Sequence, residues 1–112
     1  MNRREWRVEF MRGALRYAVL AALSTEKVHG YELLVRLKER GLGHTTGGVM
    51  YPLLKRLEGE GLVSHVWDTD SGGPARKVFE LTERGRQSLS AAEVAWNDIT
   101  ESLSWLKGEE PR

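Results

Sequence analysis

Residues 44–63, HTTGGVMYPLLKRLEGEGLV, contain the side chains whose type and spacing best indicate a chemical role. Apolar residues at i, i+3, i+4 and i+7 predict one buried stripe of an α-helix: Met50, Leu53, Leu54 and Leu57. The opposite face would carry a phenol, two cations, a proline and a glycine: Tyr51, Lys55, Arg56, Pro52 and Gly48. Such a small, basic, hydrogen-bonding face suits a DNA groove, so we predict a DNA-reading helix.

The other reactive side chains do not form a catalytic or metal-binding set. The chain has no cysteine, so disulfides, thiolate chemistry and Cys-type zinc sites are not available. His29, His44 and His65 share no i, i+4 spacing, and we interpret them as helix-cap or surface residues, with a metal or pH-sensing site as the alternative. No carboxylate pair or Ser/His/Asp set suggests catalysis. We expect no enzymatic activity, no metal and no cofactor.

The composition indicates one ordinary globular domain. With 112 residues, 40% of them hydrophobic and 29% charged, the chain can bury a modest core. Residues 1–60 hold 11 Lys and Arg against 7 Asp and Glu, whereas residues 87–112 hold 2 against 5; random surface scatter is the alternative explanation. The longest apolar run, residues 17–23, is far shorter than the ~20 residues of a membrane span. The N-terminus does not resemble a signal peptide, so we expect a cytoplasmic protein without a membrane partner.

The N-terminal quarter predicts a terminal segment followed by a central helix. Trp6 and Phe10, at i, i+4, give residues 2–13 an aromatic side that needs a cover, either from the domain's own core or from a second subunit. Gly13 then allows a bend. Residues 14–27 are apolar on nearly all sides, which is typical of a helix at the centre of a fold.

A second helix is predicted for residues 28–43, with Gly41 as the left-handed residue that ends it. After a turn around Gly43, Thr45 or Thr46 is a natural N-cap for the reading helix. Two amphipathic helices joined by a short turn that contains glycine make a helix-turn-helix.

Pro52 interrupts the pattern of the reading helix. Its ring would strike the carbonyl of Gly48, four residues earlier. Because Gly48 has no Cβ and lies near the helix start, we expect a local bend rather than a break. The alternative is that Pro52 ends a short helix.

A β-hairpin should follow the reading helix. An alternating strand pattern, rich in β-branched and aromatic residues, covers residues 62–67 and 77–81. Residues 70–74 form a turn cluster between these two segments. A hairpin in this position is a wing. Arg76 and Lys77 would lie at its tip or on its returning strand, beside two glycines that allow close backbone approach. These cations could contact phosphates or enter a minor groove.

The C-terminal part predicts a long helix over residues 82–107, with Thr82 as its N-cap, and a frayed tail over residues 108–112. Apolar residues at a 3-4-3-4-3 spacing form a heptad seam: Leu89, Ala92, Trp96, Ile99, Leu103 and Leu106. Because the winged domain, residues 1–81, should already have a core, we expect the seam to face a second subunit, with intramolecular packing as the alternative. The expected fold is mainly α with a small β-hairpin: a winged helix-turn-helix with a long C-terminal dimerisation helix.

In this order, the segments resemble the PadR family of bacterial transcriptional regulators, and specifically its small members with one C-terminal helix. The matching segments are HGYEL (29–33), the TxGxxYPLLKRLExEGL stretch (46–62), GGPARKVFELTERG (72–85) and AWND (95–98). The resemblance covers nearly the whole chain, and the combination of YPLL-RLE-GL with GGP-RK-LT-GR is specific to the family.

The resemblance implies a winged-helix homodimer that binds a roughly palindromic DNA operator and usually represses a nearby gene. Family members dimerise through the C-terminal helix and the partner's N-terminal helix, which would cover Trp6 and Phe10. The motifs assign the DNA contacts to the reading helix (Gly48, Tyr51, Lys55, Arg56), to the wing (Gly73, Arg76, Lys77) and to backbone contacts near helix starts (Tyr31, Thr46).

The chain departs from the family pattern in two places. Val49-Met50 stands where Thr-Leu is common, which removes a hydroxyl that could reach DNA. Gly59 replaces a usual charged residue and should weaken the helix end by ~1 kcal/mol relative to Ala.

Trp96 has two interpretations. It is either a hydrophobic core residue or, as in some small members that this chain resembles, part of a site where tryptophans paired across the dimer axis sandwich a flat aromatic ligand. The function that we expect is a dimeric repressor released by a small planar or aromatic effector. The alternative is a winged-helix interaction module that docks protein and has no operator of its own.

Overall fold

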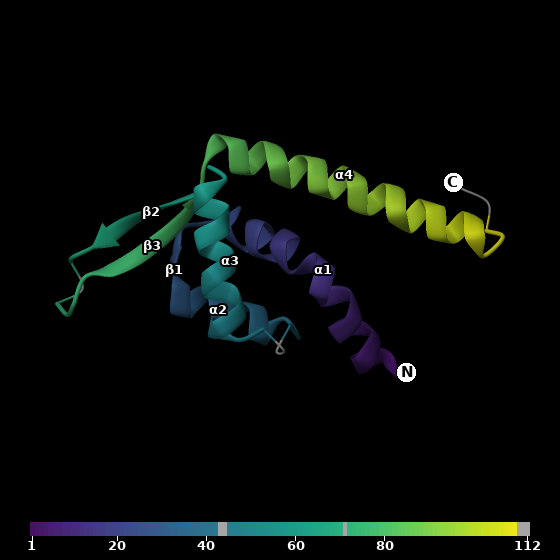
Figure 1. The fold of residues 1–112 in the computed structure, drawn as a ribbon, viewed down its shortest axis with the longest axis horizontal. Helices are drawn as coiled ribbons and strands as arrows, with labels where there is room; N and C mark the ends of the chain where they lie inside the picture. The colour runs from purple at the N-terminus through teal and green to yellow at the C-terminus, as the bar shows by residue number, and fades with distance from the viewer. Residues whose placement is uncertain (43–44, 71, 110–112) are drawn as a thin grey trace.

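Residues 1–42, 45–70 and 72–109, which a computed structural model describes, form four helices and a three-stranded antiparallel sheet (Figure 1). The elements are α1 (Arg3–Leu23), β1 (Val28–His29), α2 (Gly30–Glu39), α3 (Gly47–Gly59), β2 (Val63–Asp68), β3 (Arg76–Leu81) and α4 (Glu83–Leu106). The predicted fold class, mainly α with a winged hairpin and a long C-terminal helix, is confirmed. Gly43 of the predicted turn, His44, Ser71 of the turn cluster and residues 110–112 of the predicted tail lie outside the described residues.

The predicted terminal segment and central helix form one continuous helix, α1, which runs through Gly13. α1 begins with a capping box, in which the Asn2 side chain accepts from the Glu5 backbone N–H at 2.9 Å and the Glu5 carboxylate accepts from the Asn2 backbone. Glycine permits a bend without requiring one and costs a helix interior only ~1 kcal/mol relative to Ala. The helix-forming residues on both sides of Gly13 therefore keep this position helical.

One strand was not predicted. Val28 and His29 pair with Phe79 and Val78 of β3, so the sheet order is β1-β3-β2. The second helix begins at Gly30 rather than at residue 28, because the two residues before it are held in extended conformation by this pairing. The helix ends at Glu39, and Gly41, two residues later, has a φ of +80°, which confirms the predicted left-handed stop.

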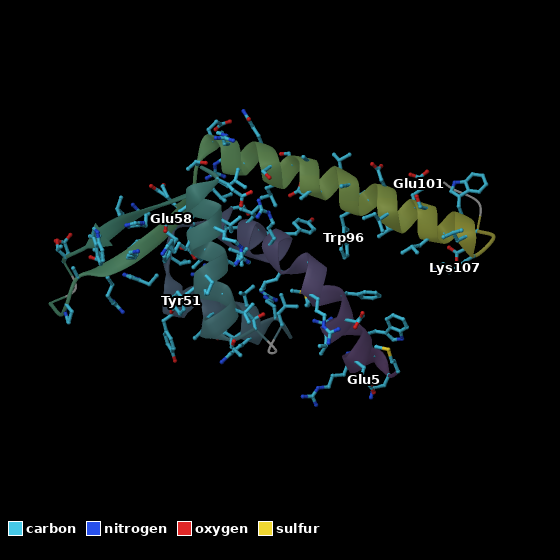
Figure 2. The ribbon with its side chains drawn as sticks, in the orientation of Figure 1. Glu5, Tyr51, Glu58, Trp96, Glu101 and Lys107 are labelled. Carbon is cyan, nitrogen blue, oxygen red and sulfur yellow. The ribbon has the colours of Figure 1, made fainter. Side chains whose placement is uncertain are left out.

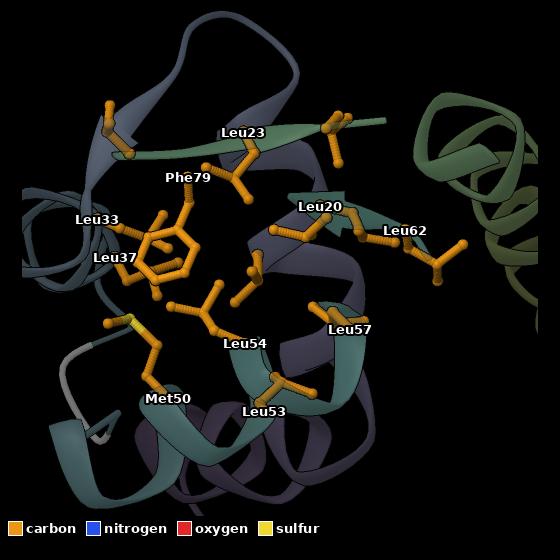
Figure 3. Close-up of a cluster of buried hydrophobic side chains, with 14 of the residues drawn as sticks. Leu20, Leu23, Leu33, Leu37, Met50, Leu53, Leu54, Leu57, Leu62 and Phe79 are labelled. Carbon is orange, nitrogen blue, oxygen red and sulfur yellow. The ribbon is translucent and has the colours of Figure 1, made fainter. Parts of the chain in front are cut away.

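The reading helix runs through its proline. α3 begins after Thr46, whose carbonyl accepts from the Met50 N–H at 2.9 Å, and continues through Pro52 to Gly59. The alternative in which Pro52 ends a short helix is therefore wrong. The predicted apolar stripe of α3 is buried against α1, α2 and the sheet (Figure 3), and the labelled core residues are Leu20, Leu23, Leu33, Leu37, Met50, Leu53, Leu54, Leu57, Leu62 and Phe79.

The predicted ends of both hairpin strands lie within one residue of the observed ends. β2 and β3 pair in register from Val63 opposite Leu81 to Asp68 opposite Arg76. Arg76 therefore lies in the ladder of the returning strand rather than in the turn.

The start of α4 is fixed tightly to the end of α3. The Thr82 hydroxyl accepts from the Gly85 N–H at 3.0 Å and donates to the Gly61 carbonyl at 2.6 Å, and the Thr82 N–H donates to the Leu62 carbonyl at 3.1 Å. A Cβ on Gly85 would lie 2.0 Å from that Leu62 oxygen, so only glycine fits. Leu89, one turn further, is only 7% exposed and belongs to the core, which contradicts its assignment to a dimer seam.

Beyond Leu89, α4 extends away from the domain and diverges from α1 (Figure 1). The radius of gyration is 16.2 Å, compared with about 13 Å for a compact chain of this length. α4 ends in an ordered cap, because Gly108 has a φ of +79° and the Glu109 N–H donates to the Ser104 carbonyl at 2.9 Å. The first two residues of the predicted frayed tail are therefore part of this cap.

Candidate nucleic-acid interface

A cleft of about 590 Å³ separates the exposed side of α3 from the hairpin and the start of α2. Five of the residues predicted to bind DNA line it together: Tyr31, Tyr51, Lys55, Arg76 and Lys77. The helix-turn-helix supplies the first three and the returning strand of the hairpin supplies the last two. The cleft therefore presents two phenols and three cations on one side of the molecule.

Tyr51 is held in place by two glycines. A Cβ on Gly30 would lie 2.6 Å from Tyr51 Cε1, and one on Gly47 would lie 3.1 Å from Tyr51 Cε2. The ring therefore packs over the starts of both α2 and α3, yet the side chain remains 44% exposed (Figure 2). A phenol in this setting is positioned by packing and still reaches solvent.

Four predicted contact residues do not line the cleft: Thr46, Gly48, Arg56 and Gly73. Within the described part of the chain, Thr46 caps α3 with its carbonyl and makes no side-chain cap bond. Gly48 has room for a Cβ, since its nearest neighbour would be the Thr46 hydroxyl at 3.7 Å. Gly73 lies in the loop between β2 and β3, and a Cβ there would meet no described atom within 4 Å.

Arg56 lies on the side of α3 that faces Glu60. The pKa of Glu60 is below its ordinary value, chiefly because the Arg16 guanidinium donates to its two oxygens at 2.6 and 2.8 Å, with a smaller contribution from the charge of Arg56. The Arg16–Glu60 pair joins α1 to the end of α3.

The hairpin carries an exposed aromatic residue that was not predicted as part of the site. Trp67 stands directly opposite Lys77 in the β2–β3 ladder and is 58% exposed. The Lys77 Nζ lies 5.7 Å from the centroid of the Trp67 ring, within the range of a cation–π contact. Both side chains line the cleft.

Two histidines contact carboxylates of other elements. His29 is the N-cap residue of α2, as the cap interpretation predicts, although its side chain makes no cap hydrogen bond. His65 Nδ1 lies 2.7 Å from Glu58 Oε2, which joins β2 to α3. His29 Nε2 lies 3.0 Å from Asp68 Oδ2, which joins β1 to β2 across the central strand. The pKa of Asp68 is lowered, chiefly by the Asp70 backbone N–H that donates to it at 3.0 Å and next by His29. Among the described residues, no three His, Asp or Glu side chains gather as metal ligands would.

An apolar groove of about 560 Å³ runs between α1 and α4. It is lined by Phe10, Gly13, Ala14, Tyr17, Ala92, Ala95, Trp96, Ile99, Thr100 and Leu103. Trp96 points from α4 toward α1, with its ring centroid 5.9 Å from that of Tyr17, and is 43% exposed (Figure 2). Trp6, near the start of α1, and Leu106, at the end of α4, were also predicted for the dimer interface and are exposed.

Comparison with known proteins gives a consistent match. The model of the PadR-like transcriptional regulator family matches residues 19–91. Transcriptional regulator Rv3488 of Mycobacterium tuberculosis is 34% identical over 96 residues, which cover 85% of this chain and 87% of that protein. Transcriptional regulator YqjI of Escherichia coli is 35% identical over 82 residues, but this match spans only 38% of that protein.

Solved structures agree with the fold. A PadR-like transcriptional regulator from Bacillus cereus superposes with a TM-score of 0.80 at 30% identity, covering 91% of this chain and 99% of that one. Bacillus subtilis PadR, solved in complex with operator DNA, superposes with a TM-score of 0.66 at 30% identity, covering 75% of this chain and 48% of that one. In the described part of the chain, no helix has both the length and the apolar character needed to cross a membrane.

Proposed function

Because this chain belongs to the PadR-like family of transcriptional regulators, we propose that it is a homodimeric repressor that binds a roughly palindromic DNA operator. The family consists of transcriptional regulators and not of enzymes. The observation that carries the proposal is the cleft in which the α3 residues Tyr51 and Lys55 lie together with Arg76 and Lys77 of the hairpin. Cations from two elements on one side of a domain suit the phosphates on either side of a DNA groove.

In this proposal α3 enters the major groove. Tyr51 and Lys55 face the bases and nearby phosphates, and Arg56 and Gly48 flank them along the same helix. The hairpin residues Gly73, Arg76 and Lys77 contact the neighbouring backbone or minor groove. Tyr31 and Thr46, at the starts of α2 and α3, contact phosphates. The solved complex of Bacillus subtilis PadR with operator DNA supports this assignment by analogy.

We propose that a second copy of the chain covers the groove between α1 and α4. Support comes from the apolar side chains that remain exposed beyond the core, which are Trp6, Phe10, Trp96, Ile99, Leu103 and Leu106, together with the half-buried Ala92. Apolar surface of this extent on two diverging helices is typical of a subunit interface. A two-fold dimer would bind half-sites separated by about one or two helical turns of DNA.

The groove also suits the proposed effector. Trp96 and Tyr17 present aromatic faces at its side, and its lining is almost entirely apolar. A small planar aromatic ligand would stack on such faces. We propose that this ligand binds at Trp96 in the dimer interface and releases the protein from its operator.

The DNA-binding proposal is tested with labelled duplex from the protein's own upstream region and fluorescence anisotropy at several salt concentrations. The logarithm of the affinity should fall linearly with the logarithm of salt concentration. Lys55→Ala and Arg76→Ala should each weaken binding about tenfold and reduce the salt slope by about one. Lys107→Ala, which removes a cation at the end of α4, is the matched control and should bind like the wild type. Equal binding by all three variants, or none by the wild type at low salt, would instead favour a module that docks protein.

A further inference from the structure

We propose that His65 is a positioning residue that holds the hairpin cation Lys77 in a fixed relation to the reading helix. The inference rests on the proposed DNA-binding function and adds a residue to it that makes no contact with DNA. It is carried by a continuous series of contacts from α3 to Lys77 that passes through the His65 ring.

The first contact joins the reading helix to the hairpin. Glu58 lies three residues after Lys55 on α3 and lines the same cleft. Its Oε2 is 2.7 Å from His65 Nδ1, and the two side chains are each 25% exposed (Figure 2 labels Glu58). Because a carboxylate can only accept, Nδ1–H of His65 donates and the orientation of the imidazole is fixed.

The second contact places Trp67. The His65 ring meets the Trp67 ring edge to face, with centroids 5.8 Å apart and planes at 88°. The His65 ring also lies 6.0 Å from the ring of Phe79, its cross-strand partner, which is buried in the core. The imidazole therefore contacts both a core aromatic ring and the exposed tryptophan, and edge-to-face packing is a favoured geometry for such pairs.

The third contact reaches the cation. Trp67 and Lys77 are cross-strand partners, and the Lys77 Nζ lies 5.7 Å from the tryptophan ring centroid. A lysine side chain is long and flexible, so a ring that restricts it lowers the entropy lost when it meets a phosphate.

The test is a double-mutant cycle in operator binding. In the wild-type background, Lys77→Ala should weaken binding about tenfold. In the His65→Ala background, the same substitution should weaken binding less than threefold further, because Lys77 has already lost its support. Lys55→Ala is the comparison, since Lys55 is held by α3 itself. This substitution should weaken operator binding by the same factor in both backgrounds. Additive losses for Lys77 and His65 would overturn the proposal.

A second measurement uses the protein without DNA and does not depend on His65→Ala folding. The four tryptophans are labelled as 5-fluorotryptophan. The ¹⁹F resonance of Trp67 is identified as the one that is missing from the spectrum of Trp67→Phe. Glu58→Ala should shift this resonance, and Glu58→Gln, which keeps an oxygen that can accept from His65, should largely restore it. A resonance unmoved by Glu58→Ala would overturn the inference. Failure of the wild type to bind DNA would overturn the proposed function, and this inference with it, whereas additive losses in a protein that binds DNA overturn the inference alone.

Discussion

The Tyr51 ring lies directly over Gly30, so that a Cβ on Gly30 would be 2.6 Å from Tyr51 Cε1. Gly30 is the first residue of α2, and Tyr51 is on the exposed side of α3. The packing of the two helices therefore determines the direction in which the phenol points. This contact connects the stability of the helix-turn-helix to the geometry of its proposed DNA face.

Gly30→Ala should displace the Tyr51 ring, because the added methyl and the ring cannot occupy the same space. Overpacking of this kind typically costs about 1–3 kcal/mol, and operator affinity should fall together with the free energy of unfolding. Urea unfolding and fluorescence anisotropy measure the two effects. Gly59→Ala is the control, since a Cβ there meets nothing within 4 Å among the described residues, and alanine at this helix position should stabilise by up to ~1 kcal/mol. Wild-type affinity in Gly30→Ala would exclude a role for the position of Tyr51.

Leu103→Glu should produce a monomer that is still folded. Leu103 lines the α1–α4 groove and is exposed in the single chain, so a charge there opposes burial by a second copy without disturbing the core. Light scattering after size-exclusion chromatography gives the mass, and circular dichroism reports the fold. Val94→Glu is the control: Val94 is also exposed but lies nine residues away, on the opposite side of α4. A monomeric wild type, or a dimer that survives Leu103→Glu, would contradict the proposed interface.

Trp96→Ala should reduce the affinity for planar aromatic ligands at least tenfold, because it removes the largest stacking surface of the groove. Isothermal titration calorimetry with a panel of planar dyes and phenolic acids measures this without relying on tryptophan emission. Trp105→Ala removes an exposed indole outside the groove and should leave the affinity unchanged. If both variants lose affinity equally, or neither does, the ligand does not bind at Trp96.

Glu60→Gln should reveal a pH-dependent contribution of the Arg16–Glu60 pair. Since Arg16 lowers the pKa of Glu60 in the folded protein, the pair stabilises the fold above the ordinary carboxyl pKa of about 4.3. That contribution is lost as the pH falls through the lowered pKa. The wild type should therefore be more stable than Glu60→Gln in urea at pH 7, and the difference should be smaller at pH 3 and in high salt. Glu9→Gln, which breaks a pair within α1, should show little difference at either pH. A wild-type advantage that is unchanged at pH 3 would argue against the ion pair as its cause.

The parts of the fold that were predicted depend on local periodicity. The stripe of α3 follows helical spacing within one segment, and the alternation of β2 and β3 is equally local. The same reasoning predicted that four side chains lie on one side of the molecule: Tyr51, Lys55, Arg76 and Lys77. A helix-turn-helix followed by a hairpin allows few other arrangements.

The features that were not predicted depend on contacts between distant segments. β1 has only two residues and exists because Phe79 and Val78, some fifty positions later, pair with it. Leu89 continues the heptad spacing of α4, and no local signal shows that the helix is still within the core at that point. His65 and Trp67 did carry a signal, since residues two apart on a strand share a face. Their partner Glu58, however, lies on another element.

The close packing of Gly85 against the Leu62 carbonyl holds the start of α4 against the segment that follows α3. The 24 residues of α4 therefore act as a rigid arm, about 36 Å long at 1.5 Å per residue. A change of about 5° at its base corresponds to about 3 Å at its tip, close to the roughly 3.4 Å between neighbouring base pairs. In a dimer joined along these arms, small changes of crossing angle would thus alter the distance between the two reading helices by about one base-pair step.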